Sequence, residues 1–597
     1  MDYARRFLGP AKVPARLADL INVSSLPQIR EPRNRSALEA MVRNFSSDSV
    51  RYRHSIRELL DDDRNAFLTN VVRVLKSDTD SRAAQYLLAL LVSENLLYDA
   101  LCDPALNLEQ ALAVARLAAR VDPMVDVGVA RRLAEAAVSD AEASSLGDAG
   151  RILQILAEIS DGTRILPSLM RLLRNANPYL RSKAVLLIGR GSRSVKWVRH
   201  RLGEADARVR ANAVEALWGV DSAEARELLR FAASDGNNRV AGNALLGLYW
   251  LGDSAVIAEL VKMAGHASNL FRLSAAWAMG ETGDPRFSEV LGKMLADANA
   301  GVRKRAFAAV SQVKLAAAQL AQNREWLVSA FLVGKDSHKT SRRIRVAVVP
   351  DTGGENLKIL PTHFIVSEDN QTVMSYQVLE RPAREAMTVI FVFPRTTTPD
   401  VAPWNQGALR CLDWKRPTDL WCTVPYLADD DSAPDPGLEL ELPPFSAQPQ
   451  LAAAALTNLH KRTDCTEFWT ALWRTVRGES GPVRGKRHLI VFAPGDTARV
   501  AGHGLVASVI SSRTSVQVIS TGPNSALQDF CRMTGGAFQT GETDAALAEL
   551  VTRAYLNLLA RWDITYQPVV PGASAIRVRV NAPTGWGESS ISIPGAE

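Results

Sequence analysis

The chain has 597 residues, of which 47% are hydrophobic and 22% are charged, and its formal net charge is +6. A chain of this length exceeds one compact core, so at least two domains of ordinary globular composition are expected. The charge is modest for this size, which excludes a molecule built throughout as a polycation.

Residues 1–50 carry Pro10, Pro14, Pro27 and Pro32 among charged, Ser and Asn residues. Prolines at this density prevent a regular helix, and the segment is predicted to be an extended lead-in. Helical periodicity then runs through residues 51–325, where apolar side chains recur every three or four positions. Breakers such as Gly252-Asp253 interrupt the pattern at intervals, and each is expected to end one helix.

Five alanines recur in step within this helical region, with separations of 29, 31, 31 and 31 residues. An Arg or a Val-Arg pair precedes most of them. A fixed period near thirty is typical of a two-helix unit that buries its apolar face only by stacking on neighbours. The small side chain is predicted to lie where two helices approach closely. The five residues are Ala184, Ala213, Ala244, Ala275 and Ala306.

The repeat around Ala213 reads Arg-Val-Arg-Ala-Asn-Ala-Val-Glu-Ala-Leu-Trp-Gly over residues 208–219. This pattern resembles HEAT-type repeats, particularly the short bacterial variety, and the match covers residues 178–313 well. The stretch before residue 178 keeps helical periodicity but loses the register. The resemblance implies an α-solenoid that recognises proteins, without indicating a particular partner.

The period changes from 3.6 to 2 near residue 326, and residues 326–385 are predicted to be rich in β-strand. Residues 343–348 alternate polar and apolar side chains, and residues 364–366 and 376–378 are further candidate strands. We expect these strands to form one small β-sandwich with the strands of residues 563–597, because neither set alone could bury both of its faces.

Residues 386–562 contain continuous apolar runs of β-prone residues separated by helical stretches. Such runs are typical of parallel strands covered on both faces, and the alternation predicts a doubly wound α/β domain. The runs cover residues 388–393, 420–424, 488–492 and 515–519.

Three segments of this half resemble von Willebrand factor A (vWA) domains, over roughly residues 340–580. Residues 360–370 read Leu-Pro-Thr-His-Phe-Ile-Val-Ser-Glu-Asp-Asn, residues 534–538 contain a Thr-Gly-Gly turn, and residues 562–568 match the closing strand. The family implies a metal-ion-dependent adhesion site, with DxSxS after the first strand, a Thr from a later loop and an Asp after a central strand.

In this sequence both metal-binding carboxylates are replaced by proline, at Pro394 and Pro494. Hydroxyls remain, but a hard divalent cation needs anionic oxygens to offset the water it loses. We therefore predict no metal and no other cofactor. The crevice either binds a carboxylate or phosphate of a partner or is a vestigial loop without a ligand. Its candidate residues are Arg395, Thr396, Thr398, Thr466 and Asp496, the last being predicted as a turn residue.

Ten Lys and Arg residues lie between positions 164 and 201 without an intervening Asp or Glu. They are either a solvated face or a surface that binds acidic peptide, membrane headgroups or nucleic acid. The Arg at the repeat position is expected to be partly structural, bonded to helix-end carbonyls. The ten are Arg164, Arg171, Arg174, Arg181, Lys183, Arg190, Arg193, Lys196, Arg199 and Arg201.

Catalytic motifs are absent from the sequence, since neither a GxSxG, an HExxH nor a phosphate-binding glycine loop is present. Residues 189–192 read Gly-Arg-Gly-Ser, but they fall at a repeat turn and are predicted to end a helix. The sequence thus indicates a non-enzymatic adaptor for unidentified protein partners. Two alternatives stay open, a solenoid that binds nucleic acid and a lyase-like accessory protein of the short-HEAT type.

The compartment is inferred from the cysteines and the hydropathy. Five cysteines form an odd set without a CxxC pair, which argues against a disulfide framework and a zinc site. No apolar run of signal-peptide length follows Arg5 and Arg6, and the densest apolar stretch, residues 86–92, is too short to cross a bilayer. A cytoplasmic protein is expected.

Overall fold

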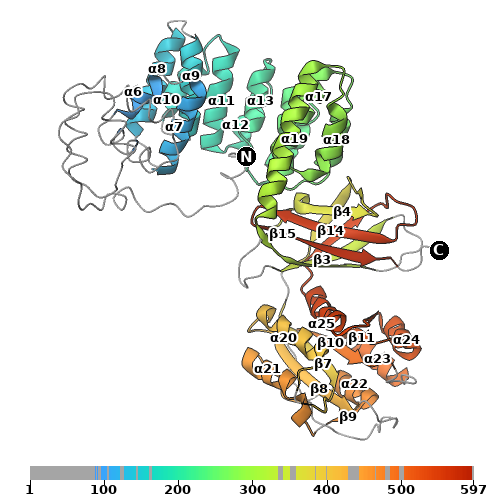
Figure 1. The fold of residues 1–597 in the computed structure, drawn as a ribbon. Helices are drawn as coiled ribbons and strands as arrows, with labels where there is room; N and C mark the ends of the chain where they lie inside the picture. Colours follow the sequence, from blue (N-terminus) through green and yellow to red (C-terminus); the bar gives the residue numbers. More distant parts are fainter. Residues whose placement is uncertain are drawn as a thin grey trace, which may run out of the picture. The chain divides into compact units, whose positions relative to one another are not determined.

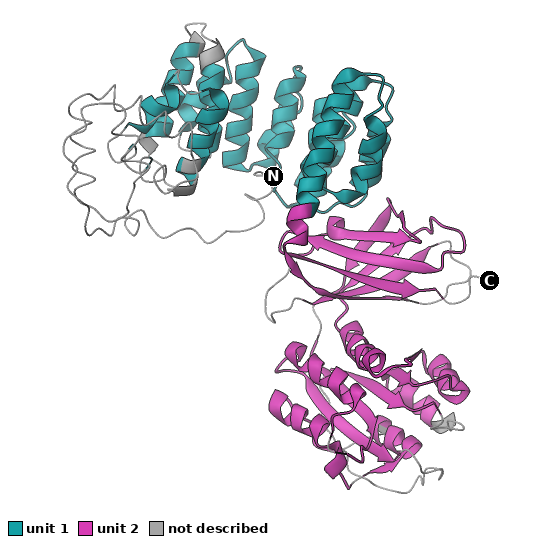
Figure 2. Cartoon of the chain, viewed as in Figure 1, with its two compact units in different colours: residues 1–317 teal, residues 318–597 magenta. Residues whose placement is uncertain are grey.

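The computed structural model of the chain describes Leu88, Leu91 and residues 96–103, 107–121, 127–142, 146–159, 165–333, 341–349, 358–382, 385–398, 400–427, 443–463, 465–477, 485–495 and 503–593. The chain divides into two compact units, residues 1–317 and 318–597 (Figure 2). The lead-in predicted for residues 1–50 lies outside the described residues.

The first unit is a stack of helices, as the periodicity predicted (Figure 1). The repeated alanines lie in α11, α13, α15, α17 and α19, here named the A helices, and all five are fully buried. The alternating α12, α14, α16 and α18 are named the B helices. The described helices are α6 (Leu97–Cys102), α7 (Leu108–Val121), α8 (Val127–Glu142), α9 (Leu146–Ile159), α10 (Leu166–Leu172), α11 (Pro178–Ser192), α12 (Val195–Arg201), α13 (Ala207–Glu215), α14 (Ala223–Ala232), α15 (Asn238–Trp250), α16 (Val256–Ala264), α17 (Asn269–Thr282), α18 (Ser288–Met294) and α19 (Ala300–Ala321).

Asx side chains start four of the A helices, since Asn177, Asp206, Asn237 and Asn299 each accept a backbone N–H of the first turn. The end of α11 differs from the expectation for residues 189–192, because the left-handed residue is Arg193, with φ 48°, rather than a glycine. Gly189 lies inside the helix, where an added Cβ would come within 2.5 Å of the Ala216 Cβ. That glycine serves close helix packing rather than helix termination.

The second unit begins and ends with strands that form two sheets. The five-stranded sheet has the order β1-β15-β14-β4-β5, and the four-stranded sheet has the order β2-β3-β13-β6. The rings of Phe364 and Trp562, one from each sheet, have their centroids 5.8 Å apart, so the sheets pack as a sandwich. The strands are β1 (Arg324–Glu325), β2 (Leu327–Leu332), β3 (Arg342–Val349), β4 (Phe364–Glu368), β5 (Gln371–Thr372), β6 (Tyr376–Glu380), β13 (Trp562–Tyr566), β14 (Ala575–Ala582) and β15 (Gly585–Ser592).

Between these strands the chain forms a six-stranded, fully parallel sheet with the order β12-β11-β10-β7-β8-β9. One apolar core joins it to α22, α23 and α24, and another joins its other face to α20, α21 and α25. The elements are β7 (Met387–Pro394), α20 (Pro403–Arg410), β8 (Leu420–Leu427), α21 (Pro449–Thr457), β9 (Thr466–Glu467), α22 (Phe468–Arg477), β10 (Lys486–Ala493), α23 (His503–Ser511), β11 (Ser515–Ser520), α24 (Ser525–Thr534), β12 (Ala537–Thr540) and α25 (Asp544–Leu558).

The predicted fold class is therefore confirmed as an α-solenoid followed by a small β-sandwich and a doubly wound α/β domain. The strand order also locates a candidate site. The chain runs outward from β7 to β8 and β9 and then returns to β10 on the other side of β7, so the topological switch point lies between β7 and β10. Ligands of open α/β sheets bind at the carboxyl ends of the strands at this point.

Candidate functional site

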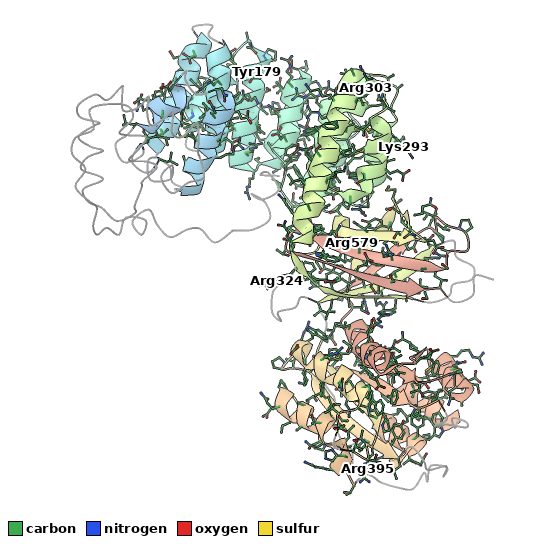
Figure 3. The ribbon with its side chains drawn as sticks, viewed as in Figure 1. Tyr179, Lys293, Arg303, Arg324, Arg395 and Arg579 are labelled. Atoms are coloured by element: carbon green, nitrogen blue, oxygen red, sulfur yellow. The ribbon has the colours of Figure 1, made fainter. Side chains whose placement is uncertain are left out.

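Arg395, one of the candidate crevice residues, lies at one end of the α/β domain, after the carboxyl end of β7 (Figure 3). Pro394 of β7 pairs in register with Tyr426 of β8, and Tyr426 pairs with Thr466 of β9. The Arg395 backbone N–H donates to the Tyr426 carbonyl at 2.8 Å, which fixes the start of the loop after β7. Arg395 and Thr466 thus lie at the same edge, with the end of β8 between them.

The side chains at this edge differ in exposure. Arg395 and Thr398 are exposed, and Thr396 is half-buried. The Thr466 hydroxyl is buried and has no hydrogen-bond partner among the described residues. Asp496 lies outside the described residues. A buried hydroxyl without a hydrogen-bond partner is uncommon in a folded protein, which makes Thr466 a candidate for contact with a ligand.

Two neighbouring loops hold the rest of the edge in place. The Gly495 backbone N–H donates to Thr521 Oγ1 at 3.0 Å, and Asn524 Nδ2 donates to the Gly495 carbonyl at 3.1 Å. The carboxylate next to Thr466 is Glu467, which accepts the backbone N–H groups of Trp469 and Thr470 at 3.0 and 2.6 Å. Glu467 is therefore the N-terminal cap of α22, and both of its oxygens are engaged.

The described donor groups of the crevice do not fit a hard divalent cation. Its described groups are hydroxyls and a guanidinium, and its nearby carboxylate is committed to a helix terminus. Among the described residues, no group of three or more His, Cys, Asp or Glu side chains is placed to hold a metal ion.

The nine basic residues from Arg171 to Arg201 are distributed over α10, α11, α12 and the segments that join them. Several contact other groups: Arg181 donates to the Asn175 and Ala176 carbonyls, and Arg201 pairs with Glu204 at 2.9 Å. Arg164 lies outside the described residues, and Arg171 is exposed on α10. Exposed members without an ion pair to a described residue are Arg174, Arg193, Lys196 and Arg199.

The A helices carry a separate cluster of charge around Glu215 of α13. Arg190 of α11 pairs with Glu215 at 2.7 Å, and each of these side chains is 19% exposed. Burial raises the pKa of Glu215, while Arg190, Lys183 and Arg239 act to lower it. Burial also lowers the pKa of Lys183. Lys183 and Arg190 belong to the ten basic residues identified in the sequence, but no sequence pattern indicated that Arg239 would lie near the same carboxylate.

A bidentate clasp locks successive repeats together. Arg210 donates from Nε and Nη2 to Asp235 at 2.9 and 3.0 Å, and Arg272 does the same to Asp297 at 2.7 and 2.9 Å. Each pair is separated by 25 residues, a spacing visible in the sequence but not recognised there. Each Arg also donates from Nη1 to two carbonyls just before its helix, which bears out the structural role expected for this position.

The segment that carries the vWA resemblance, residues 360–370, has a structural role that the sequence did not reveal. Glu368 is fully buried, pairs with Arg342, and accepts the backbone N–H groups of Val569 and Val570 at 2.8 Å each. Asp369, with φ 41°, accepts the N–H and hydroxyl of Ser574, both at 2.9 Å. These two carboxylates tie β4 to the segment that precedes β14.

Comparisons with known proteins agree with this architecture. The family model for HEAT repeats matches residues 195–271 and 251–311, which confirms the repeats predicted from the sequence. No curated protein matches the chain.

Similar solved structures each cover less than half of this chain. Human deoxyhypusine hydroxylase in complex with glycerol shares 14% identity, over 42% of this chain and 96% of its own, with a TM-score of 0.24. A von Willebrand factor type A structure from Catenulispora acidiphila shares 9% identity, over 45% and 74%, with a TM-score of 0.24. A designed armadillo repeat protein in complex with peptide (KR)4 shares 18%, over 41% and 99%, with a TM-score of 0.17. These scores are too low to bear on function.

The length and hydropathy of a helix decide whether it can span a membrane. None of the helices in the described part of the chain is both long and apolar enough to cross a bilayer.

Proposed function

We propose that the chain is a non-enzymatic scaffold that binds other proteins through its helical repeats and through the crevice of its α/β domain. The repeat stack is the observation that carries the proposal. Its helices are locked by the clasps Arg210–Asp235 and Arg272–Asp297, and buried Asn212 donates to the Ser182 carbonyl across two A helices at 2.9 Å. Stacked repeats present an extended surface, and a rigid surface loses little entropy on binding.

The charge of the A helices favours an acidic partner segment. Three cations from α11 and α15, Lys183, Arg190 and Arg239, lie near enough to the single carboxylate of Glu215 to lower its pKa, and Arg190 pairs with it directly. The partly exposed rings of Trp250 and Trp277 lie beside the buried ring of Trp218, at centroid distances of 4.8 and 6.5 Å. Aromatic and cationic side chains together suit a peptide that carries both carboxylates and apolar groups.

The crevice supplies a second docking point that needs no metal. Exposed Arg395 lies at the switch point, and the described crevice residues there are cationic or neutral. A carboxylate of a partner would pair with this guanidinium. We place the scaffold in the cytoplasm, since all five cysteines are free thiols.

Capture from native lysate by the full-length chain, at about 50 mM and about 200 mM salt, tests the proposal. Arg239→Glu is expected to reduce the amount of captured protein, because it reverses a charge on the A helices. Lys293→Glu makes the same charge change on the B helix α18, at a side chain that is 74% exposed, and should leave capture unchanged. Equal losses in both variants, or capture unaffected by Arg239→Glu, would contradict the role of the A helices.

The crevice is tested separately. Arg395→Glu should lower capture of any protein that docks there, while addition of a chelator should change nothing. A chelator that abolishes capture, or heat released on titrating Mg²⁺ or Mn²⁺, would show that the site takes a metal after all.

Nucleic-acid binding is the second candidate, favoured by the four exposed cations Arg174, Arg193, Lys196 and Arg199, which pair with no described carboxylate. If they form a phosphate-binding surface, the chain will retard duplex DNA or single-stranded RNA at low salt, and the affinity will fall steeply with salt. Retardation that is insensitive to Lys196→Glu with Arg199→Glu would exclude this surface.

A further inference from the structure

The last helix of the solenoid, α19, exposes a face that every inner A helix buries. The residue after the repeated alanine is Val185, Val214, Leu245 or Ala276 in the inner A helices, and each is at most 4% exposed. The equivalent residue of α19 is Phe307, which is 68% exposed.

The same stripe of the inner helices contacts the next A helix. An added Cβ on Gly189 of α11 would meet Ala216, which directly follows α13, at 2.5 Å, and one on Gly280 of α17 would meet Ala309 of α19 at 2.9 Å. On α19 this stripe carries Lys304, Ser311 and, one turn further, Leu315, which is 54% exposed. Terminal repeats normally present a polar outer face, and this one presents Phe and Leu.

Arg303, labelled in Figure 3, makes half of the contacts that form the clasp between inner repeats. Its Nη1 donates to the carbonyls of Asp297 and Ala298 at 2.7 and 3.0 Å, as Arg210 and Arg272 do at their own loops. The residue 25 positions later is Val328 of β2, so the chain supplies no Asp there. Among the described residues, no carboxylate pairs with Arg303 Nε or Nη2. The two carbonyls bound to Nη1 hold the exposed guanidinium in place, so Nε and Nη2 form a fork that can donate to a carboxylate.

The charge of α19 indicates what would cover this face. Its 22 residues include Arg303, Lys304, Arg305 and Lys314 and no Asp or Glu. A second copy of α19 would bring like charges together, whereas an acidic helix would complement them.

We propose that α19 docks an acidic helix of a partner protein, which takes the place of the next A helix. An Asp in the loop before that helix binds the Arg303 fork as Asp235 and Asp297 bind theirs, and apolar side chains of the helix cover Phe307 and Leu315. This inference rests on the proposed scaffold function and assigns it a site and a class of partner.

The probe is a synthetic helical peptide, labelled for fluorescence anisotropy, that begins Asp-Ala-Asn, like residues 297–299, and continues as a Glu- and Ala-rich helix with two leucines on one face. Binding to the full-length chain is measured against a peptide with Asn at its first position. We expect the Asp→Asn peptide to bind about tenfold more weakly, and Arg303→Lys to lower the affinity for the Asp peptide similarly, because an ammonium cannot make the bidentate contact. Combining both changes should cause little further loss.

Arg305→Gln is the matched control, because Arg305 is two positions from both Arg303 and Phe307 and therefore lies on the opposite side of α19 from the stripe. Its loss should change affinity less than twofold. Phe307→Ser tests the apolar part without touching the clasp and should also weaken binding about tenfold, with the thermal unfolding curve unchanged. Three results would overturn the proposal. The first two are equal affinity for the Asp and Asn peptides and no binding of either peptide. A wild-type dimer in light scattering that Phe307→Ser abolishes would assign the face to a second copy and also overturn it. In each of these cases, protein capture that still depends on Arg239 would leave the proposed function standing.

Discussion

Polar side chains that recur in the repeats have partners within the fold, whereas some of those at the carboxyl edge of the parallel sheet lack them among the described residues. In the repeats, polar groups at equivalent positions meet equivalent partners, as in the Arg210–Asp235 and Arg272–Asp297 clasps. At the sheet edge, the Thr466 hydroxyl is buried without a described partner, and Arg395 is exposed. A polar residue that recurs with the repeat is thus structural. In contrast, a polar residue such as Thr466, which is retained at the position of the vWA metal-site motif although the carboxylates of that motif are replaced, is a candidate for function.

The largest loss of stability is expected at Glu368, a carboxylate of the second unit whose role, like that of the repeat clasps, is structural. Glu368→Ala removes a fully buried partner of Arg342 and two backbone N–H contacts, so it should lower the free energy of unfolding by about 3–5 kcal/mol. Differential scanning calorimetry should show the loss in the transition of residues 318–597 alone.

Glu380→Ala is the control for Glu368, because it breaks a pair with Arg561 in which the Glu side chain is 51% exposed. This substitution should lower the free energy of unfolding by only about 0–1 kcal/mol. Equal effects of the two substitutions would show that Glu368 does not clamp the sandwich.

The second prediction concerns the close approach of the A helices. Ala275→Leu adds three carbons at a fully buried position and should destabilise the solenoid by about 1–3 kcal/mol through overpacking. Urea unfolding followed by the fluorescence of the nearby tryptophans would measure it. Ala308→Leu, at an exposed position of α19, is the control, and a cost there as large as at Ala275 would contradict the packing argument.

Much of this organisation could be predicted from the sequence, because a period of 31 residues and runs of β-prone residues are local signals. The partners of side chains could not. Glu368 meets backbone groups about 200 positions away, and the Arg-to-Asp spacing of 25 gains meaning only once the helices stack. The sheet order was also hidden, since pairing β10 beside β7 depends on long-range contacts, and this pairing places the switch point at Arg395.

The third prediction is a pH dependence of the clasps. The Arg272 guanidinium and the Asn299 N–H lower the pKa of Asp297 to about 2, from an ordinary value of 3.8. Because the folded-state pKa is the lower one, the clasp stabilises the fold above about pH 4 and loses this effect as the pH falls toward 2. Asp297→Asn should cost about 1 kcal/mol near pH 6 after allowance for solvent screening, and the difference from the wild type should shrink as the pH falls. Urea unfolding at several pH values measures it, and a difference that is constant with pH would rule out the ionised clasp.

The smallest change in the free energy of unfolding is expected at the sheet edge, where Thr466 can be compared directly with a buried polar residue of the repeats. Thr466→Val keeps the shape of the side chain and removes a hydroxyl that has no described partner, so the free energy of unfolding should change by less than about 0.5 kcal/mol. The matched change in the repeats is Asn212→Leu, which removes the buried donor to the Ser182 carbonyl and should cost about 1–3 kcal/mol. If Thr466→Val were as costly as Asn212→Leu, the hydroxyl would be held by a structural partner. A near-neutral Thr466→Val that nevertheless weakens docking at Arg395 would show that this hydroxyl is retained for a ligand rather than for the fold.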